Sequence, residues 1–192
     1  MTVARRPVAL RVRLERPSLG RQREFLGAVR RSRTLLGRWV APPVTARAYR
    51  AYVARTLEPP HEGHFVVLRA SGRLVGVANL SEIVRGNFRS AYLGYYGFHP
   101  YAGRGYMREG LFLVLRRAFR ELRLHRVEAN IQPGNQSSRA LAQRLGFRRE
   151  GFSPRYLKIA GRWRDHERWA LLAEDFSRRP ACYHPGLWHT KG

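Results

Sequence analysis

Residues 93–110 read LGYYGFHPYAGRGYMREG, in which a strand-like aromatic run leads through a Gly-x-Gly turn into the start of an amphipathic helix. The first turn of a helix has backbone N–H groups without intrahelical partners, and the helix macrodipole adds partial positive charge there. Gly103 and Gly105 let the backbone approach an anion closely. Arg104 and Arg108 add full positive charges beside the turn. The stretch therefore predicts a site for a phosphate-bearing ligand.

The glycine turn does not fit two better-known phosphate-binding motifs. A dinucleotide fingerprint has a third glycine where this chain has Arg108, and no βαβ unit opens the chain. A Walker A loop requires Gly-Lys-Ser or Gly-Lys-Thr, which the sequence lacks. The pyrophosphate of coenzyme A remains as the familiar ligand for this arrangement.

Hydrophobic periodicity and turn residues predict one α/β domain over residues 1–176, followed by an irregular tail over residues 177–192. The pattern predicts strands over residues 8–14, 64–70, 73–82, 89–98, 125–132, 147–152, 156–159 and 168–172, and helices over residues 18–36, 45–57, 105–122 and 136–145. Hairpins in the middle of the chain and a strand-helix-strand crossover behind them imply a mixed, mostly antiparallel sheet with helices on both faces.

Composition bounds the compartment and the partners. The single cysteine, Cys182, excludes an intrachain disulfide and fits a reducing compartment. No apolar run approaches the roughly 20 residues of a membrane span, and residues 1–10 lack the apolar core of a signal peptide. We therefore expect a cytoplasmic protein without a membrane partner. The 7 histidines show no ligand spacing, so no metal site is expected.

The net charge of +24 would ordinarily favour a polyanionic partner. However, all of the 37 basic residues except Lys158 and Lys191 are arginine, and they are spread over the whole chain rather than gathered in one tract. This distribution favours a non-specific affinity for ribosomes or RNA as a secondary property, and not nucleic-acid binding as the main function.

A second motif follows in residues 132–147, QPGNQSSRALAQRLGF, which predict a short helix with Asn135 as its N-cap and Gly146 just beyond its end. A Gly-x-Gly loop followed by such a helix resembles the GNAT acetyltransferases. Three segments, GYYGFHPYAGRGYMREGL, LHRVEANIQPGNQSSRALAQRLGFRREGF and RYLKIAGRWRDHERWAL, are similar to the RimJ/RimL group of ribosomal-protein alanine N-acetyltransferases, and to RimJ most of all. The similarity covers residues 60–175.

The resemblance implies a GNAT fold, acetyl-CoA as the co-substrate and a set of binding groups. These groups are the backbones of Tyr96 and Phe98 for the pantetheine amides, the N–H groups of Gly103, Arg104, Gly105, Tyr106 and Met107 for the pyrophosphate with Arg108 beside them, Asn135 for the pantetheine arm, and Ser138 for protonation of the departing thiolate.

The general base is harder to assign. The tyrosine that many GNAT enzymes use as an acid falls at Ala142, and a glutamate base of RimL-like members falls at Leu157. Glu82, at the end of the strand expected over 73–82, is the preferred base, and a solvated strand end is the alternative. Glu109 is expected to oppose the helix dipole. Asp165 and His166 line the acceptor side or form a strand-end ion pair.

These observations predict an N-acetyltransferase that acts on the N-terminal amine of a ribosomal or other basic protein, as a monomer or a homodimer. An α-amine has a pKa of about 7.7–8.0 and a lysine about 10.4, so an N-terminal amine needs less help from a base. Two alternatives stay open. One is acetylation of a small amine such as an antibiotic or a polyamine, and the other is a ribosome- or RNA-binding protein with a degenerate coenzyme site.

Overall fold

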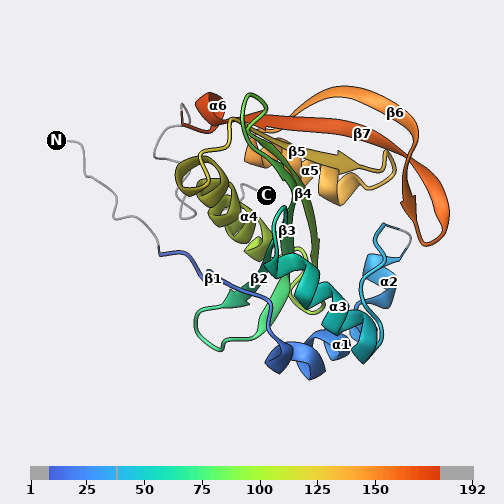
Figure 1. The fold of residues 1–192 in the computed structure, drawn as a ribbon. Coiled ribbons are helices and arrows are strands. Elements are labelled where there is room, and N and C mark those ends of the chain that lie inside the picture. The colour runs from blue at the N-terminus through green and yellow to red at the C-terminus, as the bar shows by residue number, and fades with distance from the viewer. Residues whose placement is uncertain (1–8, 38, 178–192) are drawn as a thin grey trace, which may run out of the picture.

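The protein is described here from a computed structural model, which covers residues 9–37 and 39–177 (Figure 1). Its strands are β1 (Val12–Glu15), β2 (Glu62–Leu68), β3 (Leu74–Val84), β4 (Ser90–Gly97), β5 (Arg126–Ile131), β6 (Arg148–Ile159) and β7 (Arg162–Leu172). They form one seven-stranded sheet in the order β1-β2-β3-β4-β5-β7-β6. All neighbouring pairs run antiparallel except β4 and β5, which run parallel. The predicted mixed, mostly antiparallel sheet is confirmed.

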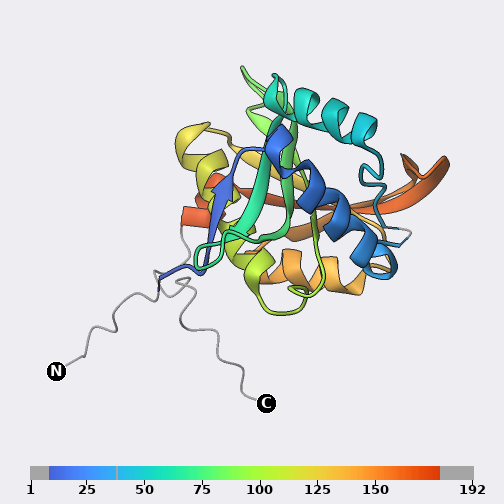
Figure 2. The same cartoon turned by 90° about the horizontal axis from the view of Figure 1, so that it is seen from below.

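Helices cover both faces of the sheet, as Figures 1 and 2 show. They are α1 (Gln22–Arg31), α2 (Arg33–Leu36), α3 (Ala46–Leu57), α4 (Tyr106–Arg116), α5 (Gln136–Leu145) and α6 (Ala173–Ser177), with a 3₁₀ turn η1 (Leu19–Arg21) before α1 and a π-helical turn η2 (Arg117–Glu121) after α4. Phe25 of α1 and Tyr49 of α3 are buried in a core on one face. Leu111 of α4 and Leu145 of α5 are buried in a core on the other face.

The predicted helix over residues 18–36 is wrong as a single element, whereas the helix predicted to begin at Thr45 is confirmed. Thr45 Oγ1 accepts a hydrogen bond of 3.2 Å from the backbone N–H of Ala48. The Ser18 side chain makes no capping hydrogen bond. The longer helix is interrupted at Ser32, whose buried hydroxyl accepts a hydrogen bond of 2.9 Å from the N–H of His99. A long-range polar contact therefore competes with helical continuity there.

Three other boundaries differ from the sequence pattern. The helix predicted over 105–122 ends as an α-helix at Arg116, and the two strands predicted over 147–152 and 156–159 form the single strand β6. An irregularity in the ladder between Ser153 and Leu157 accommodates the break in the pattern. Helix α6 was not predicted, and Cys182 and the rest of residues 178–192 lie outside the described residues. The boundary of the tail therefore stays a prediction.

Glycines set how closely α4 approaches the sheet. A Cβ atom on Gly110 of α4 would lie 2.5 Å from a methyl carbon of Val66 on β2. A Cβ atom on Gly76 of β3 would lie 2.4 Å from the sulfur of Met107, in the first turn of α4. These contacts leave no room for side chains, so the start of α4 is held against β2, β3 and β4 at a fixed distance.

We expect Gly110→Ala to lower the free energy of unfolding by about 1–3 kcal/mol, because the added methyl group overpacks the contact with Val66. Urea unfolding followed by circular dichroism measures this loss. The double variant Val66→Ala with Gly110→Ala should recover part of it relative to Val66→Ala alone. Equal losses from Gly110→Ala in both backgrounds would contradict this account of the contact.

Candidate functional site

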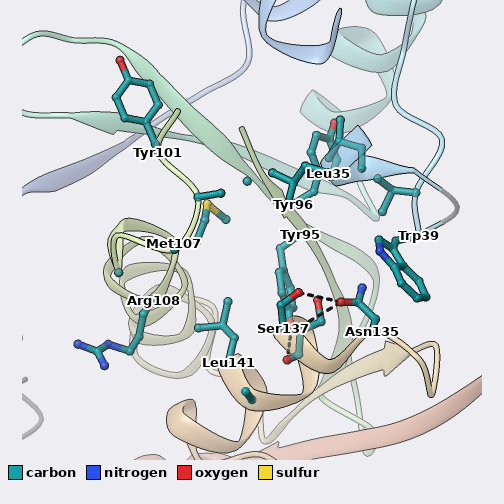
Figure 3. Close-up of a pocket in the computed structure, with 18 of the residues that line it drawn as sticks. Leu35, Trp39, Tyr95, Tyr96, Tyr101, Met107, Arg108, Asn135, Ser137 and Leu141 are labelled. Atoms are coloured by element: carbon teal, nitrogen blue, oxygen red, sulfur yellow. Dashed lines mark hydrogen bonds between the residues drawn. The ribbon is translucent and has the colours of Figure 1, made fainter. Parts of the chain in front are cut away.

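A pocket lies where β4 and β5 separate. The two strands pair only between Ser90–Tyr92 and Arg126–Glu128, and the ladder ends there. The pocket has a volume of about 350 Å³ and lies between the glycine turn, the far end of β4, the start of α5 and the end of α2 (Figure 3). A parallel pair that opens part-way along its length thus exposes backbone edges in the interior of the sheet.

The glycine turn has the geometry of an anion cradle. Gly103 and Gly105 have φ angles of 78° and 79°, which side chains other than glycine rarely adopt. Gly105 is the N-cap of α4. Within the described part of the chain, no hydrogen bond is made by the N–H groups of Gly103, Gly105, Tyr106 or Met107. These unpaired donors at a helix N-terminus suit a phosphate oxygen.

An ion pair between a buried carboxylate and an exposed arginine fixes this turn to the edge of the sheet. Glu109 is 4% exposed and accepts hydrogen bonds from Arg11, at 2.7 Å from the backbone N–H and 2.6 Å from Nε. Arg11 in turn donates to the carbonyl of Arg104 at 3.1 Å and lies over the ring of Tyr106 at 4.4 Å. Glu109 was expected to act on the helix dipole, but its main partner is Arg11, which precedes β1.

The predicted role of the Phe98 backbone is wrong. Its N–H donates to the carbonyl of Val75 at 2.7 Å, and its own carbonyl accepts from Tyr101 and Ala102. Backbone groups alternate along a strand, so those of Tyr96 also face β3, whereas those of Tyr95 and Gly97 face the opening. The edge that is available to a ligand therefore lies one residue away from the predicted one.

The cap of α5 forms the opposite side of the pocket. Asn135 Oδ1 accepts from the Ser138 backbone N–H at 3.2 Å and from Ser137 Oγ at 3.0 Å, which confirms Asn135 as the N-cap. Tyr95 reaches across the opening, and its hydroxyl donates to the Ser138 carbonyl at 3.1 Å (Figure 3). The Ser138 side chain also lines the pocket, where it interacts with the hydroxyl of Tyr95.

The outer wall of the pocket comes from residues that sequence reasoning missed. Leu35, Leu36, Trp39 and Val40, from α2 and the segment after it, line the pocket. The Trp39 carbonyl accepts from Gln132 Nε2 at 3.1 Å, and a Cβ atom on Gly134 would lie 3.3 Å from the Trp39 ring. The sequence after α2 is typical of a linker, and it has no hydrophobic periodicity that would predict a role in lining the pocket.

Two tyrosines of the pocket, Tyr95 and Tyr96, are held in the protonated state. Burial raises the pKa of Tyr95 to about 12, although the hydrogen bond to Ser138 acts in the opposite direction. Burial also raises the pKa of Tyr96 well above its ordinary value. Both hydroxyls are thus donors at neutral pH, and neither is a base.

The structure brings most of the predicted cofactor residues to one place. The pocket is lined by Tyr96, Gly103, Gly105, Met107, Arg108, Asn135 and Ser138. Phe98, Arg104 and Tyr106 do not line it, although the last two belong to the turn that does. Glu82 lies at the far end of β3, five residues or roughly 16 Å along the strand from Val77, which pairs with Tyr96.

The two residues predicted at the acceptor side lie on β7. Asp165 Oδ1 accepts from the backbone N–H of Arg155 at 2.7 Å, so this carboxylate supports the irregular part of β6. His166 is buried, and its Nδ1 lies 2.9 Å from the carbonyl oxygen of Arg164. Neither side chain forms the predicted strand-end ion pair within residues 9–37 and 39–177.

No cluster of three or more histidine, cysteine or acidic side chains in the described residues has the spacing of a metal site. None of the described helices has the length and apolar character needed to cross a membrane.

Comparison with protein families matches residues 11–148 to the acetyltransferase (GNAT) domain. A Bacillus subtilis protein named "Probable N-acetyltransferase YjcK" is 40% identical over 120 residues, which are 62% of this chain and 66% of that protein. The [ribosomal protein uS5]-alanine N-acetyltransferase of Escherichia coli is 43% identical over 104 residues, which are 54% of each chain. The chain thus spans between half and two thirds of the length of these curated relatives.

Solved structures share the fold over most of the chain. Mycobacterium smegmatis RimJ in complex with CoA-disulfide has a TM-score of 0.78 at 26% identity, covering 85% of this chain and 82% of that one. Spermidine N-acetyltransferase of Vibrio cholerae, in complex with CoA and spermine, has a TM-score of 0.74 at 20% identity, covering 87% of this chain and 98% of that one. The second likeness shows the fold alone.

We expect Asn135→Ala to lower the free energy of unfolding by about 0.5–2 kcal/mol, because it removes the cap that binds the Ser138 N–H. Asn135→Ser is the matched control, since a serine hydroxyl also caps helices well. Denaturant titration of the three proteins measures the difference. Equal stabilities of the Ala and Ser variants would show that the cap does not hold the start of α5.

Proposed function

Because the chain belongs to the GNAT acetyltransferase family, we propose that it transfers an acetyl group from acetyl-CoA to an amine. The observation that carries this proposal is the pocket at the separation of β4 and β5, with four unpaired N–H groups at one end and the start of α5 at the other. The two ends differ in chemistry, as the two ends of acetyl-CoA do. The relative with 26% identity that was solved with CoA-disulfide supports the same ligand.

We place the pyrophosphate at the N–H groups of Gly103, Gly105, Tyr106 and Met107, with the Arg108 side chain beside it. The pantetheine arm then pairs with the open edge of β4 at Tyr95 and Gly97, next to Asn135. This arrangement brings the thioester to the end of the opening, close to Ser138. An N–H group on that edge would polarise the thioester carbonyl.

The acceptor in this proposal is the N-terminal amine of a protein, and specifically of a ribosomal protein. The relative with 43% identity is named for alanine acetylation of ribosomal protein uS5. An α-amine with a pKa of about 7.7–8.0 is partly neutral at physiological pH, whereas a lysine amine is almost wholly protonated. The net charge of +24 also disfavours a polycationic small amine, which the chain would repel.

The reaction needs little covalent help from the protein. The neutral amine attacks the thioester carbon directly, and the thiolate of CoA departs from the tetrahedral intermediate. In this proposal the Ser138 hydroxyl gives the departing sulfur a proton. Its place in the first turn of α5, with its backbone N–H held by Asn135, keeps the hydroxyl at the pocket.

Saturating acetyl-CoA, at about a hundred times its dissociation constant, should stabilise the protein by about 2.7 kcal/mol. For a chain of this length that gain corresponds to roughly 5–10 °C in Tm. Thermal unfolding at fixed salt measures the shift, and a polyphosphate of similar charge controls for binding to a basic surface. No shift, or an equal shift with polyphosphate, would favour a ribosome- or RNA-binding protein.

Ser138→Ala should lower kcat by roughly 10²-fold while the thermal shift with acetyl-CoA persists, because only the proton for the leaving group is lost. Ser138→Thr keeps a hydroxyl and should retain most of the activity. The assay follows acetylation of a peptide with an N-terminal alanine by mass spectrometry, with spermidine as a competing acceptor. Faster acetylation of spermidine would instead support the small-amine alternative.

A further inference from the structure

His166 does not line the pocket, but it lies on β7 beside the end of β5, where Gln132 binds the outer wall of the pocket. Ile131 of β5 pairs with Glu167 of β7, and Ile131 belongs to the core on the α4 face. Side chains alternate along a strand, so Gln132 and His166 point to the opposite face. On that face Gln132 binds the carbonyl of Trp39, which lines the pocket. In Figures 1 and 2 the free end of the β6–β7 hairpin bends towards the same segment after α2.

The hydrogen-bonding of His166 fixes which nitrogen holds the proton. A carbonyl oxygen only accepts, so Nδ1 carries the hydrogen toward Arg164 and Nε2 carries the lone pair. Burial lowers the pKa of His166 below its usual 6.5, although the Arg164 carbonyl and the Asp165 carboxylate act in the opposite direction. The ring is therefore neutral at neutral pH.

The lone pair on Nε2 is not used by the protein. Although His166 is only 3% exposed, Nε2 makes no hydrogen bond within the described part of the chain. Nε2 is not fully enclosed by the protein, so solvent or a small group can still reach it. A neutral imidazole with a fixed tautomer and an accessible lone pair has what a general base requires.

Few charges surround the ring. On β7, the side chains of Arg164 and Arg168 share the face of His166, and the carboxylate of Asp165 acts on it from the next position. From β6, the ring of Tyr156 lies 6.2 Å from that of His166. Directly after β5, Gln132 adds a neutral amide. The groups on the neighbouring elements are thus a phenol and an amide, and the charged groups near the ring lie on its own strand.

We propose that His166 Nε2 is the general base that accepts the proton from the acceptor amine, directly or through one water molecule. This inference rests on the proposed acetyl transfer and names a residue for its proton step. The C–N bond forms as the neutral amine attacks the thioester carbon, and the nitrogen then carries an extra proton. That proton moves to His166 Nε2 while the C–S bond breaks and sulfur keeps the electron pair. Sulfur takes one proton either from solvent or from Ser138, and in the second case Ser138 regains a proton from solvent. The imidazolium returns one proton to solvent, so protons balance.

The positions of His166 and Glu82 relative to the pocket distinguish the two candidates for the general base. Glu82 is exposed at the opposite end of β3 from the pocket, with a φ of 50° in a bulged part of the strand. His166 lies on a strand next to β5, whose end leads into the cap of α5. A carboxylate far from the opening cannot reach the reacting nitrogen.

The test is the pH dependence of kcat/KM for a peptide with an N-terminal alanine, from about pH 5 to about pH 9. Both the amine and His166 must be neutral. The logarithm of kcat/KM in the wild-type chain should therefore rise with a slope of two below the pKa of His166 and a slope of one between that pKa and that of the amine. Circular dichroism at each pH confirms that the chain is folded.

His166→Gln should lower kcat by roughly 10²–10⁴-fold, keep the thermal shift with acetyl-CoA, and show a slope of one throughout the acidic range. His125→Gln is the matched control, because His125 is exposed and lies near Glu174, at 3.5 Å, away from the pocket. It should keep the wild-type rate and both slopes.

Several outcomes would overturn the assignment. A wild-type slope of one down to the lowest pH at which the chain stays folded counts against His166 as the base. A wild-type rate for His166→Gln, or loss of the steeper limb in Glu82→Gln, has the same consequence and leaves the proposed function intact. A wild-type chain that binds acetyl-CoA but acetylates no amine overturns the proposed function itself.

Discussion

The separation of β4 from β5 after Tyr92 is the constraint on which the rest of the site depends. A parallel pair normally hides its backbone edges, but here hydrogen bonding stops after three residues on each strand. The exposed edge of β4 offers polar groups to a ligand, and the cap of α5 faces it across the gap. The segment after α2 then closes the outer side through Trp39. Each of these elements can line the pocket because β4 and β5 are not paired beyond Tyr92 and Glu128.

Sequence predicted the parts of the site whose causes are local. Gly105 must adopt a positive φ for the chain to turn into α4, and glycine is the residue that does so without strain. Asn135 is followed at the right spacing by the N–H group that it caps. In both cases the conformation depends only on residues a few positions away in the sequence. The glycine turn, the α5 cap and the helix that each begins could therefore be placed from the sequence alone.

The parts that could not be predicted depend on contacts between distant residues. A shift of one residue along β4 changes which backbone groups face the opening. The hydrogen bond from the Phe98 N–H to the Val75 carbonyl on β3 determines this choice. Trp39 becomes part of the wall only because Gln132 and Gly134 lie beneath it. Propensity and periodicity do not describe such pairings, since the partners lie far beyond one turn from each other in the sequence.

The ion pair between Glu109 and Arg11 joins the turn at the pocket to the outermost strand of the sheet. The two are therefore linked thermodynamically: whatever favours the ordered turn also favours attachment of β1, by the same coupling free energy. Fraying of an edge strand is ordinarily a local event without functional effect. In this protein, fraying of β1 would also weaken binding at the glycine turn. Selection therefore cannot change the stability of this edge strand and the affinity for a ligand separately.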